Sequence, residues 1–253
     1  SVGFIGNTIA GICSTEQTLY QSERYSNPSG TFRYLFDCPE GVYATTLLET
    51  ETWVSGPGLR IFDLYIQDQR MLTNFDIYAT AGGVNKPLRL AFTNEVTDAQ
   101  LELHFIPWVD NARVSAIQVE RIGDIDSDGD GIPNWWTRGW FNHPTGQDAD
   151  HSMWWDDADN DGFNNRDEYL AMTAPTDGGS FPVILNIFDL GHPTLSIPTA
   201  AGRLYQLERT EGPLATGSWI VIDSGIPGSG LTEELSDTNT SDAAFYRLRI
   251  TIP

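Results

Sequence analysis

The chain has 253 residues, of which 35 are acidic and 14 are basic, and its formal net charge is −21. This shortage of Lys and Arg argues against nucleic acid and anionic membrane surfaces as partners, because both are bound through clustered basic side chains. With a hydrophobic content of 40 %, the chain is too apolar to be disordered, and no apolar run is long enough to span a membrane.

Residues 18–120 have the pattern of an all-β domain. Short runs rich in β-branched and aromatic residues alternate partially between apolar and polar positions, which indicates strands. The clearest runs are residues 42–48, 60–66, 101–106 and 113–119. Turn clusters of Gly, Pro and Ser separate them, and no long segment has the period of a helix. The pattern predicts a sandwich of antiparallel sheets.

The two cysteines, Cys13 and Cys38, are compatible with either one disulfide or two buried thiols. Each lies next to a strand-like stretch, so a bridge across a hairpin is geometrically allowed. The extracellular features described below favour the disulfide.

Residues 122–179 are unusually acidic and break the strand pattern. They contain twelve Asp and one Glu against two Arg, which gives a net charge of −11. The acids recur at alternate positions and are interleaved with glycines, which a merely solvated acidic surface would not require. A short helix is expected at residues 166–172.

The segment 157–168 fits the calcium-loop template, in which acids at positions 1, 3 and 5 converge around a turn at a glycine. Position 7 offers a backbone carbonyl, and a Glu at position 12 binds through both carboxylate oxygens. The expected ligands are Asp157, Asp159, Asp161, Phe163, Asn165 and Glu168. The alternative is an acidic turn that binds nothing.

The segment 126–137 follows the same template through position 9, but its position 12 is Thr137. The bidentate Glu is therefore missing, which predicts weaker calcium binding or a ligand borrowed from a spare acid nearby. The expected ligands are Asp126, Asp128, Asp130, Ile132 and Asn134. Together the two loops predict two structural calcium ions.

The paired loops and the segments GIPNWW (131–136) and NNRDEYLA (164–171) resemble thrombospondin type 3 and dockerin-like calcium modules. The resemblance implies an extracellular connector that calcium stiffens. Five of the eight tryptophans lie here, and we interpret them as the core of a small module more than as a sugar platform. They are Trp135, Trp136, Trp140, Trp154 and Trp155.

Strand patterns resume after residue 180 and predict a second small β-sandwich. The expected strands are residues 183–188, 203–208, 219–223 and 244–250. The chain is therefore divided into a β-sandwich at 1–121, a calcium-loop module at 122–179 and a C-terminal β-domain at 180–253.

Four segments of the first domain carry a family resemblance: LYQSERY (19–25), RIFDL (60–64), NFDI (74–77) and VDNA (109–112). Together they resemble the malectin-like carbohydrate-binding domain over roughly residues 4–120. The resemblance implies a jelly-roll-like β-sandwich that binds the ends of gluco-configured oligosaccharides through loops at one edge.

The same resemblance implies the residues that contact sugar. Tyr25 matches the aromatic of the Glu-Arg-Tyr segment, Trp53 the first aromatic of the Glu-x-aromatic-aromatic loop, and Asp110 the loop acid before the final strand. Phe4 is the candidate for an upstream aromatic, and Val54 replaces the second aromatic of the Trp53 loop. Such roles are physically reasonable, because a pyranose ring packs on an aromatic face while a carboxylate accepts hydroxyl hydrogen bonds.

Family members begin with a strand upstream of the first residue of this chain. We therefore expect either an exposed sheet edge or a strand supplied by a neighbouring domain or subunit.

Catalytic motifs are not found: the four histidines have no zinc spacing, and no nucleophile elbow or P-loop occurs. The sequence predicts non-catalytic binding of a glucan or related oligosaccharide by part of a secreted bacterial polysaccharide-handling protein. The chain would then be an accessory fragment where the whole protein is an enzyme. The alternative is a structural or adhesive cell-surface protein without a working sugar site.

Overall fold

A computed structural model describes the chain except for residues 1, 5–10, 12, 14, 27–29, 190–191, 212–216 and 239–243. It divides into two compact units, Ser1–Ile125 and Asp126–Pro253, which are taken in turn. Strands dominate and the helices are short, so the all-β prediction is confirmed. In the described part of the chain, no helix combines the length and the apolar character needed to cross a membrane.

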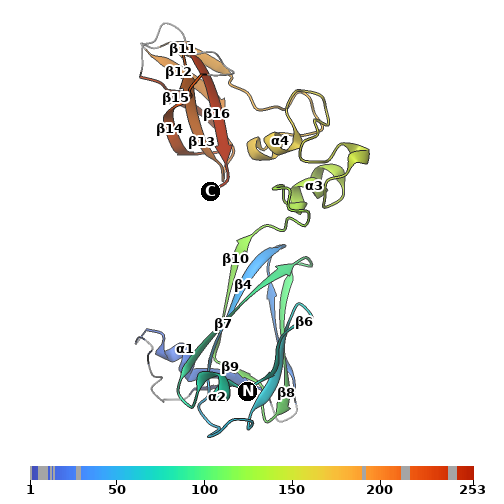
Figure 1. Ribbon diagram of the computed structural model, residues 1–253, viewed down its shortest axis with the longest axis vertical. Helices are drawn as coiled ribbons and strands as arrows, with labels where there is room; N and C mark the ends of the chain where they lie inside the picture. The colour runs from blue at the N-terminus through green and yellow to red at the C-terminus, as the bar shows by residue number, and fades with distance from the viewer. Residues whose placement is uncertain are drawn as a thin grey trace. The chain divides into compact units, whose positions relative to one another are not determined.

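The first unit is a sandwich of two antiparallel sheets that face each other (Figure 1). One sheet has the order β3 (Phe32–Asp37), β8 (Gln100–Val109), β5 (Ile61–Ile66), β6 (Gln69–Phe75). The other has the order β10 (Ala116–Gly123), β4 (Gly41–Thr50), β7 (Pro87–Val96). Apolar side chains from both sheets, including Leu47, Phe62 and Phe105, are fully buried between them. This burial is what fixes the pairing of the two sheets.

A third, small sheet joins β1 (Val2–Phe4), β2 (Ser22–Tyr25) and β9 (Arg113–Val114). Helices α1 (Gln17–Gln21) and α2 (Ile77–Ala81) belong to the same unit. Because β1 pairs with β2 over only three residues, a strand supplied from outside stays a prediction. In the described structure Cys13 and Cys38 are free thiols, so the favoured disulfide is not formed. The alternative of two buried thiols is also wrong, because Cys13 is exposed and Cys38 is half-buried.

The second unit begins with the acidic loops and three short helices, α3 (Asn134–Phe141), the 3₁₀ helix η1 (Asp148–Asp150) and α4 (Asn165–Ala171). Ile132, Trp136 and Tyr169 form their buried core. The core interpretation of the tryptophans is right for Trp136, which is 2 % exposed. It is wrong for Trp135, Trp140 and Trp155, each at least 44 % exposed, because the cluster is too small to cover them.

Two three-stranded antiparallel sheets complete the second unit. Their orders are β11 (Asn186–Asp189), β12 (Pro193–Pro198), β15 (Thr232–Ser236) and β14 (Ile220–Pro227), β13 (Leu204–Thr210), β16 (Phe245–Thr251). Leu195, Ile197 and Leu207 are fully buried in the core that the two sheets share. Because residues 126–253 form one compact unit, the separate module at 122–179 stays a prediction.

Candidate functional site

The loop that follows β4 is shaped by one buried carboxylate. Glu51 is fully buried, and its Oε1 accepts hydrogen bonds from the backbone N–H groups of Thr52 (2.9 Å), Trp53 (2.8 Å) and Val54 (3.1 Å). The Val54 side chain is buried, whereas that of Trp53 is 83 % exposed. The carboxylate therefore fixes the loop in a turn that presents one indole ring to solvent.

Arg60 joins this loop to the loop that follows β8. Its Nε donates to Oε2 of Glu51 at 2.9 Å, and its Nη2 lies 3.3 Å from Oδ2 of Asp110. Its Nη1 donates to the carbonyl oxygen of Asn111 at 3.0 Å, and the side chain is only 6 % exposed. Because a guanidinium holds its five N–H donors in one rigid plane, a single side chain fixes the two loops against each other.

Asp110 combines a fixed position with an accessible carboxylate. Its backbone has φ +55°, a left-handed conformation that Asp tolerates better than most residues. One carboxylate oxygen faces Arg60, and the side chain remains 36 % exposed. A carboxylate held in this way can accept hydrogen bonds from the hydroxyl groups of a bound sugar.

Tyr25 reaches the same loop from β2. It lies opposite Arg113 in the register of β2 and β9. The next residue, Ser26, donates its N–H to the carbonyl oxygen of Ala112 at 3.0 Å, and the N–H of Ala112 donates back to Ser26 Oγ at 3.1 Å. Tyr25, which is half-buried, is therefore tied to the segment that directly follows Asp110.

Three of the four residues expected to contact sugar thus gather at one edge of the sandwich, and we call Tyr25, Trp53 and Asp110 the edge site. The fourth, Phe4, has its backbone in β1, and its side chain lies outside the described residues. Sequence reasoning missed Trp108, which is 63 % exposed near the end of β8. Trp108 could have been predicted from the sequence, because it lies two residues before Asp110.

A second layer of buried charge lies beneath the edge site. Arg113 is fully buried, lies 2.7 Å from the Glu23 carboxylate and donates to Thr52 Oγ1 at 2.9 Å. Glu49 is also fully buried, and burial raises its pKa to about 8 although Arg113 opposes the shift. Sequence reasoning missed these residues as well, because charged side chains in strands ordinarily face solvent.

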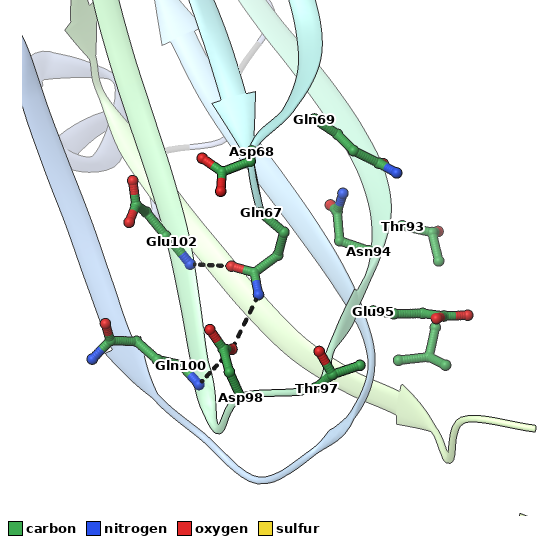
Figure 2. Close-up of a pocket in the computed structure, with 11 residues that line it drawn as sticks. Gln67, Asp68, Gln69, Thr93, Asn94, Glu95, Thr97, Asp98, Gln100 and Glu102 are labelled. Atoms are coloured by element: carbon green, nitrogen blue, oxygen red, sulfur yellow. Dashed lines mark hydrogen bonds between the residues drawn. The ribbon is translucent and has the colours of Figure 1, made fainter. Parts of the chain in front are cut away.

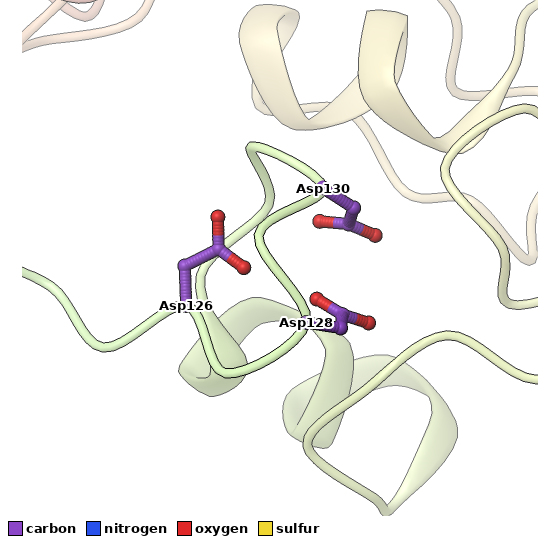
Figure 3. A group of neighbouring side chains, drawn as sticks. All are labelled: Asp126, Asp128 and Asp130. Carbon is purple, nitrogen blue, oxygen red and sulfur yellow. The ribbon is translucent and has the colours of Figure 1, made fainter.

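The first acidic loop has the three template acids in one cluster. Carboxylate oxygens of Asp126, Asp128 and Asp130 lie within 4.8 Å of one another, and Figure 3 shows the three side chains around the turn. Asp126 also accepts hydrogen bonds from the N–H groups of Gly129 and Gly131, both at 2.9 Å. The backbone thus holds the acids together despite their mutual repulsion.

The second loop repeats this arrangement and adds a buried glutamate. Asp157, Asp159 and Asp161 also offer oxygens within 4.8 Å of one another. Glu168 is fully buried on α4, and neither of its carboxylate oxygens has a hydrogen-bond partner among the described residues. Burial, together with the charges of Asp159 and Asp161, raises the pKa of Glu168 to about 8.

The two asparagines at position 9 both form hydrogen bonds within the protein, Asn134 with Ser127 and Asn165 with backbone carbonyls. Asn134 Nδ2 donates to Ser127 Oγ at 2.6 Å, and its Oδ1 accepts from the N–H of Ser127 at 2.9 Å. Asn165 Nδ2 donates to the carbonyl oxygens of His151 and Met153, while its buried Oδ1 has no partner among the described residues. Ile132 and Phe163 occupy position 7, where the template uses only the backbone carbonyl.

The second loop fits a hard divalent cation. Unpartnered buried carboxylate oxygens on Asp159, Asp161 and Glu168 are costly unless a cation satisfies them. All the donor groups are oxygens, which is the ligand type that Ca²⁺ prefers. The first loop has the same three acids but carries buried Thr137 where the second has Glu168.

Comparison with known proteins shows what the first unit is similar to. Residues 8–126 match the Malectin domain family, a match that covers less than half of the 253 residues. This part of the chain is therefore malectin-like. A protein described as "Probable LRR receptor-like serine/threonine-protein kinase" from Arabidopsis thaliana is 34 % identical over 61 residues, which are 24 % of this chain and 6 % of the relative.

Solved structures with similar parts include a β-glucuronidase from Bacteroides uniformis, with a TM-score of 0.43 and 19 % identity over 48 % of this chain and 14 % of that one. The ANX2 ectodomain from Arabidopsis thaliana has a TM-score of 0.44 and 14 % identity over 49 % of this chain and 40 % of that one. The chain therefore spans only a small part of the curated relative and less than half of each of these two structures.

Proposed function

We propose that the first unit is a non-catalytic module that binds the end of a glucan or a related oligosaccharide at the edge site. One observation supports the proposal most directly. The loop of Trp53, whose side chain is 83 % exposed, is connected to the Asp110 carboxylate by the buried ion pair of Glu51 and Arg60. An exposed indole and a fixed carboxylate on two joined loops offer a stacking surface and directed hydrogen-bond acceptors to a bound sugar. The match of residues 8–126 to the Malectin domain supports this proposal.

The edge site is shallow, so we expect micromolar to millimolar affinity. A solvent-facing ring that is not part of the core contributes contact area at the sugar without contributing to folding. Glycan binding and stability can therefore be separated by substitution at this site.

The test is a glycan array followed by calorimetry on Trp53→Ala and Asp110→Asn. Both variants should fold, because the Trp53 side chain is exposed and Asn tolerates positive φ. Each should weaken binding at least about tenfold. Trp140→Ala is the matched control, since Trp140 is also an exposed tryptophan but lies on α3 in the second unit.

Equal binding by wild type and both variants would rule out the edge site. If no glycan binds the wild-type chain, the alternative of a structural or adhesive extracellular protein is favoured.

We further propose that the acidic loops bind two structural calcium ions. The unpartnered oxygens of Glu168, Asp159 and Asp161 support the second ion, and the clustered acids of 126–130 support the first. Extracellular calcium is high enough to occupy sites of modest affinity, so this proposal fits a secreted or cell-surface protein. Calcium would then stabilise the second unit without taking part in a reaction.

A further inference from the structure

A polar pocket lies at the end of the sandwich opposite the edge site. It has a volume of about 710 Å³, within the range of pockets that bind small ligands. Its walls come from the start of β4, the β5–β6 turn, the end of β7 and the start of β8 (Figure 2). The edge site follows the other ends of β4 and β8, so the ten-residue strands separate the two.

The pocket is lined mainly by acids and amides, together with Val42, Thr93 and Thr97, and by no aromatic ring, Lys or Arg; all of its lining residues belong to the described chain. The side-chain carboxylates of Asp68 and Glu95 form no ion pair or hydrogen bond with any described residue, whereas the backbone of Glu95 pairs with Val42 in the ladder of β4 and β7. Asp98 accepts only long bonds, from Gln67 Nε2 and from the N–H of Gln100, both at 3.4 Å. Glu102 is the exception, because Arg33 neutralises it at 2.7 Å. Three negative charges at the pocket are therefore left uncompensated.

A buried acceptor also faces this pocket without a partner. Asn94 is 5 % exposed and lines the pocket, and its Oδ1 has no hydrogen-bond partner among the described residues. Its amide nitrogen contacts only Met71 Sδ, at 3.8 Å. In Figure 2 the amide group of Asn94 lies toward the side where Gln67 and Asp68 project. A buried carbonyl without a partner is costly, and a donor from a ligand would satisfy it.

The wall opposite Asn94 is already held in place. Gln67 Oε1 accepts from the N–H of Glu102 at 2.7 Å, and the N–H of Gln67 donates to the carbonyl oxygen of Glu102 at 3.1 Å. Gln67 and Asp68 form the two-residue turn between β5 and β6, with φ of +49° and +59°. Gln67 and Asp68 therefore lie on a hairpin whose geometry is fixed before any ligand binds.

We propose that this polar pocket binds a small ligand that carries a protonated amine. A donor-rich cation complements the uncompensated carboxylates and the free oxygen of Asn94, whereas a neutral sugar would find no ring to stack on. A single metal ion fits less well, because in the described chain the acids that converge closely enough for one are those of the two loops. Two sources share this chemistry: an oligosaccharide of glucosamine with free amines, and a linear polyamine.

The experiment uses the whole chain in saturating calcium. A glucosamine disaccharide, its N-acetylated counterpart and spermidine are each titrated by calorimetry, and the side-chain amide of Asn94 is followed by NMR. At least one free amine should bind, shift the Asn94 signal and bind more weakly as salt is raised. N-acetylation should weaken binding of the disaccharide at least about tenfold. Whichever of the disaccharide and spermidine binds with the higher affinity shows whether the ligand is an amino sugar or a polyamine.

Two variants localise the binding. Asp68→Asn with Glu95→Gln should weaken the amine about tenfold, and Asn is tolerated at the positive φ of Asp68. Glu120→Gln, at an exposed acid on β10, should leave it unchanged. The proposal is overturned if no amine binds, if the N-acetylated sugar binds equally well, or if Trp53→Ala abolishes binding while the pocket variant does not.

Discussion

Arg60 and Glu51 form a buried ion pair at 2.9 Å, with side chains 6 % and 0 % exposed, and this pair supports the edge site from below. The two oxygens of the Glu51 carboxylate have different partners, because Oε1 accepts hydrogen bonds from three backbone N–H groups and Oε2 accepts one from Arg60. The exposed Trp53 is therefore carried by a loop whose conformation is set by buried charge.

Glu51→Gln should destabilise the first unit by about 3 kcal/mol, because it removes the charge that compensates buried Arg60. Urea unfolding measures the change. Glu120→Gln is the matched control and should alter stability by less than about 0.5 kcal/mol, since its side chain is exposed. Equal stability of the two variants would show that the pair does not hold the loop.

β4, β5 and β16 were predicted because β-branched and aromatic residues are frequent in them. In β4 and β5 almost every position is buried or half-buried, including polar ones such as Thr45 and Asp63. β7 was missed, since its outward face carries polar and charged residues such as Arg89 and Glu95. α3 was missed, whereas α4, which is one residue shorter, was predicted at residues 166–172.

The edge site also has residues that the sequence predicted and supporting residues that it did not. Tyr25, Trp53 and Asp110 were predicted from short segments that can be read locally. Arg60 and Glu51 are nine residues apart in sequence and pair only in the folded loops, so no local pattern shows their partnership. The polar pocket was missed for the same reason, because it exists only where separate turns of the sandwich meet.

Glu49 should make the first unit less stable as pH rises through the neutral range. Its pKa is raised from 4.5 to about 8 by burial, so the folded state prefers the protonated carboxyl. The stabilising contribution is therefore complete below about pH 4.5 and is lost progressively until about pH 8. Since one pKa unit corresponds to about 1.4 kcal/mol, the total loss is on the order of a few kcal/mol.

Glu49→Gln should flatten this dependence, which urea unfolding at a series of pH values would detect. Glu120→Gln, whose carboxyl is exposed, should keep the wild-type profile. A Glu49→Gln profile parallel to that of the wild type would contradict the assignment.

Calcium should stabilise the second unit through Glu168. Occupancy at a hundredfold excess over the dissociation constant adds about 2.7 kcal/mol, which corresponds to a rise in melting temperature of roughly 5–10 °C. Glu168→Gln should lose most of this rise, yet melt higher than wild type in chelator, because Gln avoids the free-energy cost of keeping a buried carboxyl protonated beside Asp159 and Asp161. Asp167→Asn, on the exposed side of the same helix turn, should behave like wild type. If the melting temperature of the wild type is the same with calcium and with chelator, calcium has no structural role in the second unit.

Arg203 should couple the calcium loops to the C-terminal sheets. Its Nε donates to the carbonyl oxygen of Leu170 at 2.9 Å and its Nη2 to that of Tyr169 at 3.0 Å, so it satisfies carbonyls at the end of α4 from the chain just before β13. Arg203→Met removes both of these hydrogen bonds and should cost about 1–3 kcal/mol.

Calorimetry of the Arg203→Met variant should separate one unfolding transition of the second unit into two, of which only the lower-melting one responds to calcium. Arg249→Met is the control, because the Arg249 side chain is 60 % exposed and pairs with Glu208 within the sheet. If both variants unfold in one calcium-sensitive step, the loops and the sheets are joined by their packing and not by Arg203. Two transitions already present in the wild type would instead favour a calcium module that folds independently, as the sequence division at 122–179 predicts.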